Sequence, residues 1–329
     1  MYYPYFRGRQ SELLAVKDLV TSGLLSPNII PVIEPVKISS TIKRTLEAFA
    51  LKDDSRKIAI ILNPEKGISS QSNNSNLKWC DVLELEGRAN IIPGFLLNER
   101  AESLVADFIN RPGCVNKSTI AFATRDSINF IMSDQGLRLL SSLKPAVVAY
   151  PGEVQFADRV KGILKEAEYS AESVLFRDAF HKRRVNADYA QETDEWFSND
   201  HLYYTKNGYS GFGDYSIVGD TYDEGGFAPY AVAIHIVYFD HDNQLCIHHF
   251  VSDTNDDFRD TAGKFGEAGK KLERWCNERP DVFRTKGLET LLAYSKDNAF
   301  PGLPTVKKLC IMHHLELMGQ FLDKHEEQK

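Results

Sequence analysis

Several polar side chains stand where apolar, strand-length runs end, which is the position that builds the ligand site in parallel α/β folds. Carboxylates at such positions supply a general base or hold a divalent metal, and guanidinium groups bind anions. His235 lies inside the run AVAIHIVYF and offers an imidazole for proton transfer. These groups predict general acid–base catalysis or metal-assisted hydrolysis. The polar residues at or just after the run ends are Glu34, Asn63, Arg125, Asp126, Arg177, Asp178 and Asp214.

Three carboxylates and the imidazole form the predicted catalytic group. Glu34, Asp178 and Asp214 are expected to hold a divalent metal or to act as the base. His235 is expected to transfer a proton. The sequence leaves open which metal is bound, or whether another cofactor is. The residues expected to bind the ligand are Asn63, Arg125 and Arg177.

Each of these residues also has a structural interpretation. Glu34 could pair with an arginine of the N-terminal segment, and the strand-end arginines could pair with the aspartates beside them. His235 could be a hydrogen-bonded core histidine. His248 and His249 cannot join one metal site, because neighbouring residues on a strand point to opposite faces.

Strand-length apolar runs alternate with stretches of helical spacing, which predicts a parallel sheet covered by helices. Most runs are continuously apolar, as expected for strands buried on both faces. We interpret the pattern as a TIM-type (β/α)8-like barrel closed by the last run, with an open doubly wound sheet as the alternative. The eight runs are Ile29 to Glu34, Ile58 to Asn63, Ile91 to Leu97, Thr119 to Thr124, Ala146 to Tyr150, Ser173 to Arg177, Gly211 to Ile217 and Ala231 to Phe239.

Helical spacing fills most intervals between these runs. Ser39 or Ser40 is expected to cap the second helix. The stretch from Glu65 to Arg88 contains SSQSNNSN and is too long and polar for an ordinary loop, which predicts a surface excursion. The predicted helices are Ser11 to Val20, Ser39 to Leu51, Glu99 to Asn110, Gln135 to Leu143, Val154 to Glu168 and Asp188 to Phe197.

The chain beyond the eighth run predicts additions to the barrel. A turn at Asp240 to Asn243 is followed by the strand-like run Gln244 to Ser252, so the eighth run is expected to form an antiparallel hairpin. We therefore expect a barrel-like α/β domain over residues 1–252 and a helical C-terminal extension, packed on the barrel, over residues 253–329. The extension contains helical stretches at Asp257 to Asn277, Val282 to Lys296 and Thr305 to Lys324.

Composition excludes several classes of protein. The 329 residues include 39 Lys plus Arg and 46 Asp plus Glu, and the formal charge is −7. A hydrophobic content of 43% excludes a disordered chain, and the mild acidity argues against a dedicated duplex-binding module. No apolar run approaches the roughly 20 residues that span a bilayer, and no secretory signal is recognisable, so we expect a soluble cytoplasmic protein with no membrane association. The 5 widely spaced cysteines favour reduced thiols.

The densest basic segment is the run from His181 to Arg184, which lies near several tyrosines and Trp196. Basic and aromatic side chains together could bind a nucleotide or single-stranded nucleic acid. The ordinary alternative is a solvated loop. The sequence contains no G-x-G-x-x-G, P-loop, G-x-S-x-G or H-E-x-x-H motif, so the common signals of nucleotide-binding, hydrolase and metalloprotease sites are missing.

Three segments, YYPYFRGRQSELLAV, IIPVIEP and GFGDYSIVGDTYDEGG, resemble the Beta-protein family of phage and bacterial proteins. The resemblance implies a barrel-like fold and a setting in phage–bacteria conflict, but it implies no substrate. It draws attention to residues within the matching segments, and it adds Arg7, Arg9, Tyr215 and Ser216 to the expected ligand-binding residues. The residues in these segments are Arg7, Arg9, Glu12, Glu34, Asp214, Tyr215 and Ser216.

Three hypotheses about function follow. The first is a barrel enzyme, hydrolase-like, that acts on a small anionic ligand of phosphorylated or nucleotide-like chemistry. The second is a non-catalytic binding or scaffold subunit of a defence or counter-defence complex, which contacts a protein partner. The third, less favoured, is an enzyme that binds single-stranded nucleic acid through the basic run. Fold alone does not separate them, because barrels host unrelated functions.

Overall fold

The computed structural model describes residues 1–37, 39–51, 56–67, 89–110, 118–123, 128–143, 145–151, 158, 161–162, 165, 171–223 and 229–326. The chain divides into two compact units. The first consists of Met1–Arg9, Pro27–Arg177 and Tyr203–Asp214, and the second consists of Gln10–Ser26, Asp178–Leu202 and Tyr215–Lys329. The second unit thus includes residues 178–202 and 215–252, which the sequence-based boundary at residue 252 had placed with the barrel. Arg125, Asp126 and most of the polar stretch from Glu65 to Arg88 lie outside the described residues.

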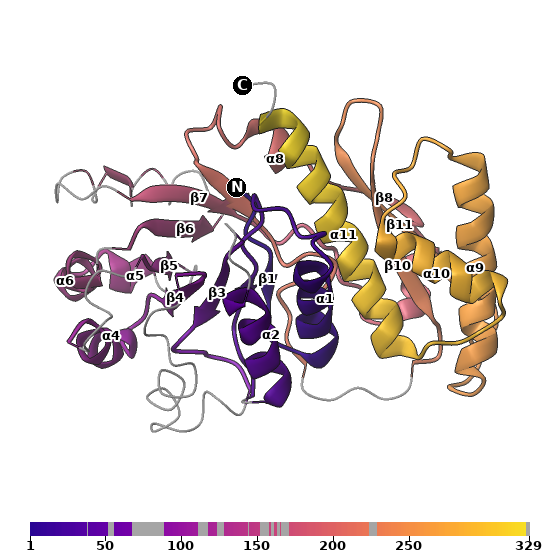
Figure 1. The fold of residues 1–329 in the computed structure, drawn as a ribbon, viewed down its shortest axis with the longest axis horizontal. Helices are drawn as coiled ribbons and strands as arrows, with labels where there is room; N and C mark the ends of the chain where they lie inside the picture. The colour runs from indigo at the N-terminus through magenta and orange to yellow at the C-terminus, as the bar shows by residue number, and fades with distance from the viewer. Residues whose placement is uncertain are drawn as a thin grey trace. The chain divides into compact units, whose positions relative to one another are not determined.

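The first unit is a parallel barrel (Figure 1). Among the described residues, eight strands pair in the order β1-β2-β3-β4-β5-β6-β7-β9, each parallel to its neighbour. Main-chain hydrogen bonds from Tyr3 N to Phe212 O and from Tyr5 N to Asp214 O, both 2.8 Å, join the first strand to the last. The TIM-type (β/α)8 prediction, with its hairpin and helical extension, is confirmed. The strands are β1 (Tyr5–Phe6), β2 (Val32–Ile33), β3 (Ile58–Ile61), β4 (Ile91–Leu96), β5 (Ile120–Phe122), β6 (Val147–Pro151), β7 (Glu172–Phe176) and β9 (Gly211–Gly213).

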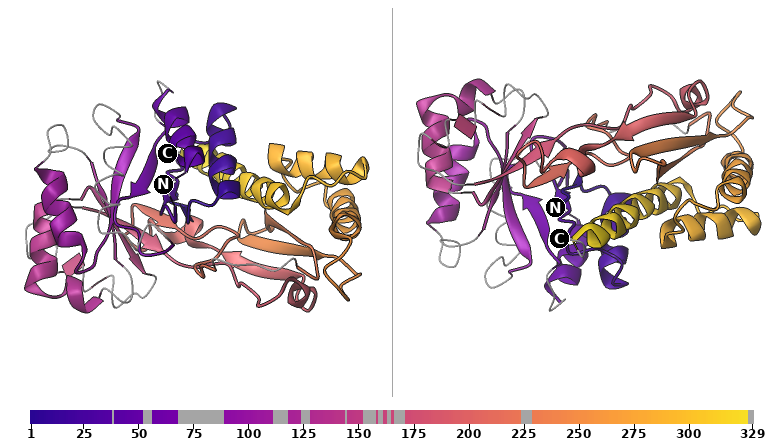
Figure 2. Two further views of the ribbon diagram at one scale, coloured as in Figure 1. Left: turned by 90° about the horizontal axis from the view of Figure 1, so that it is seen from below. Right: turned by 90° about the horizontal axis from the view of Figure 1, so that it is seen from above.

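Helices of the first unit follow the strands, as the sequence pattern predicts. Figure 2 shows the helices of residues 101–143 along the outer side of the strands. Ser39 caps the helix Ser40–Ala50 by accepting a hydrogen bond from Ile42 N, which confirms the predicted N-cap. The predicted helix from Val154 to Glu168 lies largely outside the described residues. The helices are α2 (Ser40–Ala50), α4 (Ala101–Ile109), α5 (Ile128–Ile131) and α6 (Asp134–Leu143).

The strand that closes the barrel is not the predicted one. We expected Ala231 to Phe239 to close it, and this was wrong, because that run forms a strand of an antiparallel sheet in the second unit. The N-terminal segment closes the barrel instead. Its strand β1 covers only Tyr5–Phe6 and follows Pro4, so it offers no long apolar run to detect.

Aromatic rings fill the interior of the barrel. The rings of Tyr5 on β1 and Phe122 on β5 lie 5.3 Å apart, and Phe176 on β7 lies 5.8 Å from each. Since three strands separate β1 from β5 in either direction around the barrel, these rings can meet only inside it. Paired residues of a parallel sheet share a face, so the strand register identifies the other interior residues. They include Val32, Ala59, Ile61, Gly94, Leu96, Ile120, Ala149, Val174, Gly211 and Gly213.

Glycine at position 213 makes room for these rings. A Cβ atom there would lie 2.5 Å from Tyr3 O and 2.8 Å from a ring carbon of Phe176. Contacts below 3.0 Å force the neighbours to move. The large interior rings therefore require a residue without a side chain on β9.

The second unit is built on an antiparallel sheet. Among the described residues, three strands pair in the order β10-β11-β8. On one face Trp275 packs against Tyr238 at 5.2 Å, and on the other face Phe321 packs against Phe239 at 4.9 Å. The sheet therefore lies between two C-terminal helices. The strands are β8 (Asp194–Ser198), β10 (Ala233–Phe239) and β11 (Leu245–Val251), and the helices are α1 (Gln10–Thr21), α8 (Asp200–Tyr203), α9 (Thr261–Glu278), α10 (Lys286–Lys296) and α11 (Leu303–Glu326), with the 3₁₀-helix η3 (Asn186–Ala190).

The hairpin and the three C-terminal helices confirm the predictions for this part of the chain. The predicted helix from Asp188 to Phe197 is wrong. That segment forms η3 and then β8, whose residues alternate between exposed and buried as far as Phe197. Such alternation is typical of a strand with one buried face. None of the described helices is long and apolar enough to cross a membrane.

We predict that Gly213→Ala destabilises the chain by about 1–3 kcal/mol, because the added methyl group overpacks the barrel interior. Gly266→Ala is the control. An added Cβ at Gly266, within α9, meets nothing within 4 Å, and alanine should stabilise this helix by about 0.5–1 kcal/mol. Denaturant unfolding of the two variants measures the difference. A Gly213→Ala variant with an unchanged free energy of unfolding would contradict the close packing of the barrel interior.

Candidate functional site at the barrel rim

A polar wall lies at the carboxyl ends of three adjacent strands. Arg7 follows β1, Glu34 follows β2 and Asn63 follows β3. Each lies two residues beyond an interior position, Tyr5, Val32 and Ile61 respectively, so strand alternation aims all three side chains toward the barrel axis. They are 9%, 0% and 6% exposed. The structure therefore brings together three of the residues that we expected at the site.

Glu34 is the centre of this wall. Its Oε2 accepts hydrogen bonds from the Tyr5 hydroxyl, at 3.0 Å, and from Arg7 Nη1. Its Oε1 accepts the main-chain N–H groups of Glu65, at 2.8 Å, and Lys66, at 3.1 Å. Both carboxylate oxygens are thus occupied by donors. Glu34 holds Arg7 and the segment after β3 in place, and it can act as a base or bind a metal only by releasing a donor.

Asn63 joins two strand ends. Its Nδ2 donates to Leu96 O and its Oδ1 accepts from Leu96 N, both at 2.8 Å. This pair of bonds fixes the end of β3 to the end of β4. The amide is therefore engaged with the main chain in this arrangement.

An apolar wall faces the polar one. Phe122 and Phe176, from β5 and β7, lie on the interior face with their rings 5.8 Å apart. Tyr5 connects the two walls, because its ring packs against both phenylalanines while its hydroxyl donates to Glu34. The rim thus combines a charged side with an aromatic side. The other two described arginines that we expected at the site are more accessible: Arg9 is partly exposed and Arg177 is exposed.

Asp214 lies on the other face of the barrel wall. Tyr2 pairs with Phe212, and their rings are stacked at 5.0 Å, opposite to the face that Gly213 presents to the interior. Asp214 shares the face of Phe212 and accepts a hydrogen bond of 2.6 Å from the Tyr2 hydroxyl. Burial and the neighbouring carboxylate raise the pKa of Tyr2 well above its usual value. The structure does not bring Asp214 to the interior wall that contains Glu34.

Four of the predicted site residues belong to the second unit. Asp178 accepts main-chain hydrogen bonds from Phe180, at 3.1 Å, and Asp220, at 2.9 Å, and partial desolvation raises the pKa of its carboxyl. Ser216 adopts a positive φ of 51° and its Oγ contacts His314 Nδ1 at 2.8 Å. The Tyr215 carbonyl accepts from the N–H group of residue 218 in the same turn. These contacts are structural, and the fourth residue, His235, lies on β10 rather than on a barrel strand.

His235 belongs to a hydrogen-bonded network on one face of the antiparallel sheet. Its Nδ1 lies 2.8 Å from Nδ1 of His249, its cross-strand partner. Nε2 of His249 lies 3.3 Å from Glu195 Oε1. Glu195 also contacts Nδ1 of His181, at 3.0 Å, and accepts from Arg183 Nη2, at 2.7 Å. His248 lies on the opposite face, as the strand period predicts.

The network is uncharged at its histidine end. Burial lowers the pKa of His235 to about 3 and that of His249 to about 4, despite the carboxylate of Glu195 beside His249. Both rings are therefore neutral at pH 7, and one Nδ1 must donate to the other. Burial raises the pKa of Glu195, but hydrogen bonds from Arg183 and His181 outweigh it, so the pKa lies below its usual value.

The sequence reasoning missed that His235 contacts His249 and, through it, is linked to Glu195. The contact with His249 could have been detected, because the predicted hairpin pairs its two strands residue by residue and places His235 opposite His249. Its register follows from the turn, in which Asn243 N donates to Asp240 O and Asp240 N to Gln244 O. Glu195 had no such signal, since its segment was predicted as a helix.

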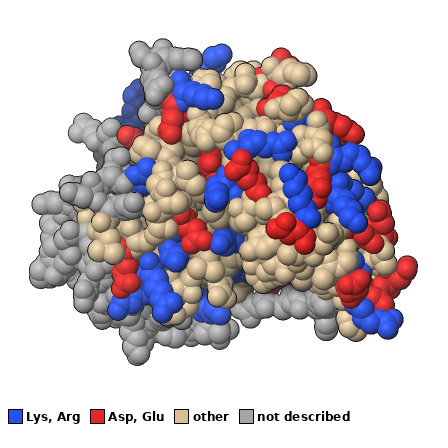
Figure 3. Space-filling model, turned by 45° about the vertical axis from the view of Figure 1, so that its right-hand side comes forward, with Lys and Arg blue, Asp and Glu red and all other residues tan. Residues whose placement is uncertain are grey.

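The basic run at residues 181–184 is largely paired with carboxylates. Lys182 contacts Asp223 at 3.0 Å, and Arg183 contacts Glu192 at 3.0 Å in addition to Glu195. Figure 3 shows basic and acidic side chains interspersed over the visible face. Paired charges attract phosphates weakly, so this arrangement gives little support to the nucleic-acid hypothesis.

The predicted divalent metal finds no preformed site in the described part of the chain. No group of three or more His, Cys, Asp or Glu side chains there is arranged to hold a metal ion. The polar rim instead holds its carboxylate with protein donors.

Comparison with known proteins adds no family assignment to this geometry. No protein-family model matches the chain, and no curated protein or solved structure matches it. The resemblance to the Beta-protein family stays a prediction.

We predict that Glu34→Gln destabilises the chain by about 3–5 kcal/mol, because it leaves the guanidinium of Arg7 buried without its counter-charge. Glu47→Gln is the matched control. Glu47 lies in α2 of the same unit and pairs with Lys43 at 4.0 Å on the surface, where such a pair contributes about 0.3–0.5 kcal/mol. Equal losses in denaturant unfolding would show that the Arg7–Glu34 pair does not organise the rim.

We also predict that acid destabilises the second unit. All 9 histidines of the chain lie within its residue ranges. An unfolded histidine gains a proton below a pKa of about 6.5, whereas a buried one resists protonation until its lower folded pKa is reached. Stability present above pH 6.5 is therefore lost as pH falls toward 4, by up to about 1.4 kcal/mol per pH unit for each histidine. The described histidines with pKa values lowered to about 3 or 4 are His201, His235, His249, His313 and His314.

Hydrogen exchange measured at pH 7, 6 and 5 tests this expectation. Amides of β10, β11 and α11 should lose protection between pH 7 and pH 5. The barrel strands serve as the internal control because the first unit contains no histidine. Equal loss of protection in both units would contradict the assignment of acid sensitivity to the buried imidazoles.

Proposed function

We propose that the chain is a (β/α)8 enzyme that binds a small anionic ligand, phosphorylated or nucleotide-like, at the carboxyl rim of its barrel. One observation carries the proposal. Arg7, Glu34 and Asn63 face the barrel axis from three adjacent strand ends, opposite the rings of Phe122 and Phe176. The carboxyl ends of the strands form the active site in barrel enzymes generally.

The buried ion pair supports a functional interpretation of this wall. A buried pair of charges contributes little net stability, and apolar residues of similar volume often replace it without loss. Natural sequences depart from apolar packing mostly at functional or strained sites. Arg7 and Glu34 are both buried, and Arg7 also lies 5.3 Å from the centre of the Tyr5 ring. The wall therefore presents a fixed guanidinium at the mouth of the barrel.

The two walls match the two parts of a nucleotide-like ligand. A guanidinium held in place by a carboxylate binds phosphate oxygens with charge-assisted hydrogen bonds. Aromatic rings offer stacking or edge contacts to a base. Hydrolysis is proposed from the residue types at the rim. The phage–bacteria conflict setting is proposed from the resemblance to the Beta-protein family.

The filled interior of the barrel favours a second candidate function, a non-catalytic scaffold subunit. The interior is filled by Tyr5, Phe122 and Phe176, and both oxygens of Glu34 are occupied by protein donors. A closed, satisfied barrel suits a scaffold subunit that binds a protein partner through other surfaces. Ligand binding at the rim separates the two functions.

We predict that a nucleotide or sugar phosphate binds the full chain, and that replacing the ion pair removes this binding. The double variant Arg7→Met with Glu34→Gln removes both charges together, and the glutamine oxygen can still accept the main-chain N–H groups of Glu65 and Lys66, so the variant should fold. Its affinity should fall about ten- to a hundredfold, the loss expected for one charge-assisted hydrogen bond. Asp214→Asn, on the outer face of the same barrel, should leave the affinity unchanged.

Isothermal titration calorimetry with a panel of nucleotides, sugar phosphates and inorganic phosphate measures these affinities. Binding that survives in the double variant would place the ligand elsewhere and overturn the rim site. A panel in which no compound binds the parent chain would favour the scaffold function.

A further inference from the structure

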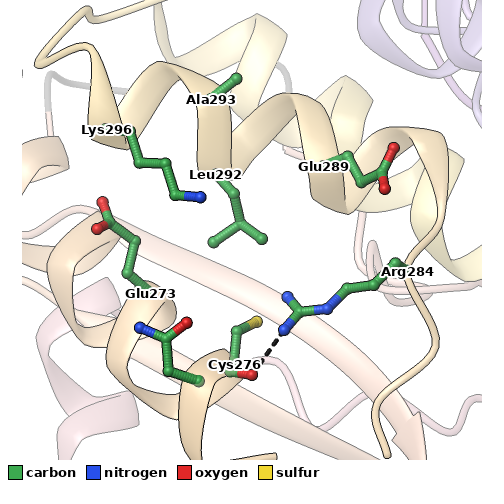
Figure 4. A pocket seen from close by; sticks show the side chains of 8 residues that line it. Glu273, Cys276, Arg284, Glu289, Leu292, Ala293 and Lys296 are labelled. Atoms are coloured by element: carbon green, nitrogen blue, oxygen red, sulfur yellow. Dashed lines mark hydrogen bonds between the residues drawn. The ribbon is translucent and has the colours of Figure 1, made fainter. Parts of the chain in front are cut away.

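A hollow outside the barrel lies between α9 and α10 of the second unit (Figure 4). Its volume is about 370 Å³, at the lower end of the range for small-molecule sites. Both helices supply side chains, and Arg284 comes from the segment that connects them. The residues that line the hollow are Glu273, Cys276, Asn277, Arg284, Glu289, Leu292, Ala293 and Lys296.

Opposite charges line this hollow without pairing to one another. Lys296 and Glu273 lie on one side of the Leu292 side chain, and Arg284 and Glu289 lie on the other. Within the described residues, no ion pair of 4.0 Å or less joins any two of these charged groups, and the side chains of Lys296 and Glu289 make no hydrogen bond. Arg284 donates one hydrogen bond of 2.6 Å to Cys276 O, and Glu273 accepts one from Ser295. Charges held apart around open space suit a ligand that carries both signs.

The floor of the hollow is apolar. Leu292 and Cys276 are buried beneath the charged groups. Burial raises the pKa of the Cys276 thiol even though Arg284 and Lys296 act in the opposite direction. The thiol therefore stays protonated at neutral pH and behaves as a small apolar group. A short apolar side chain of a ligand would contact this floor.

We propose that this hollow binds a free α-amino acid with an apolar side chain. The α-carboxylate contacts Lys296 and the α-ammonium contacts Glu273, which lie on the same side of Leu292, and Arg284 and Glu289 line the other side of the hollow. The side chain lies on Leu292 and the Cys276 thiol. A dianion is disfavoured because the two glutamates repel it, and a diamine is disfavoured because the two cations do so. The proposal is independent of the rim and of the barrel's reaction.

Calorimetry of the full chain with three related compounds tests the requirement for both charges. Leucine carries both charges, N-acetylleucine retains only the carboxylate, and leucinamide retains only the ammonium. Leucine should bind, and each derivative should bind at least about tenfold more weakly, because N-acetylleucine lacks the charge that contacts Glu273 and leucinamide lacks the charge that contacts Lys296. Equal binding of N-acetylleucine would show a simple anion site and overturn the proposal, as would the absence of leucine binding.

Two variants locate the site. Lys296→Met removes a cation that makes no hydrogen bond or ion pair with described residues, so the fold should be unaffected, and leucine should bind about tenfold more weakly. Lys270→Met is the matched control, since Lys270 is exposed on α9 and does not line the hollow. It should bind leucine as the parent chain does. Equal affinities of the two variants would place any leucine site elsewhere and overturn the proposal.

Discussion

The pairing of the N-terminal segment with two strands at once is the constraint on which the first unit depends. This segment donates to β9 through Tyr3 N and Tyr5 N, and it accepts from Val32 N and Glu34 N on the side of β2. Because both edges are paired, its register is fixed, and with it the face on which each side chain lies. Tyr5 and the arginine two residues later must then face the axis. The rim, the ion pair and the interior rings all follow from that register.

Most of the fold could be predicted, and the part that could not has a clear cause. Seven of the eight predicted runs coincide with described barrel strands, because continuously apolar runs are a strong signal of strands buried on both faces. The closing strand lacks this signal, since it covers only Tyr5–Phe6 and its neighbours are tyrosines and a proline. The run from Ala231 to Phe239 has the signal but belongs to another sheet. Hydrophobicity shows that a strand is buried, not which partner covers it.

The candidate site shows the same limit at the level of single residues. The position of Glu34 at a strand end was readable, but its four described donors were not, because two are main-chain groups of a distant segment. Asp214 also ends a strand, but Gly213 occupies the interior position, so the side chain of the next residue, Asp214, lies on the outer face. Strand ends in a sequence identify the rim, whereas the face depends on register. The same holds for His235, which is linked through His249 to Glu195, a residue of a segment with helical spacing.

The closing pair of strands has a consequence for how the chain is made. The Tyr2 hydroxyl and the carboxylate that it contacts are 212 residues apart in the sequence. During synthesis the first strand therefore leaves the ribosome long before its second neighbour exists, and the barrel stays an open sheet with unpaired edges until β9 has been translated. Contacts of such high sequence separation form slowly and leave strand edges exposed meanwhile. The brevity of β1 limits that exposure, since a two-residue edge offers little template for pairing with another chain.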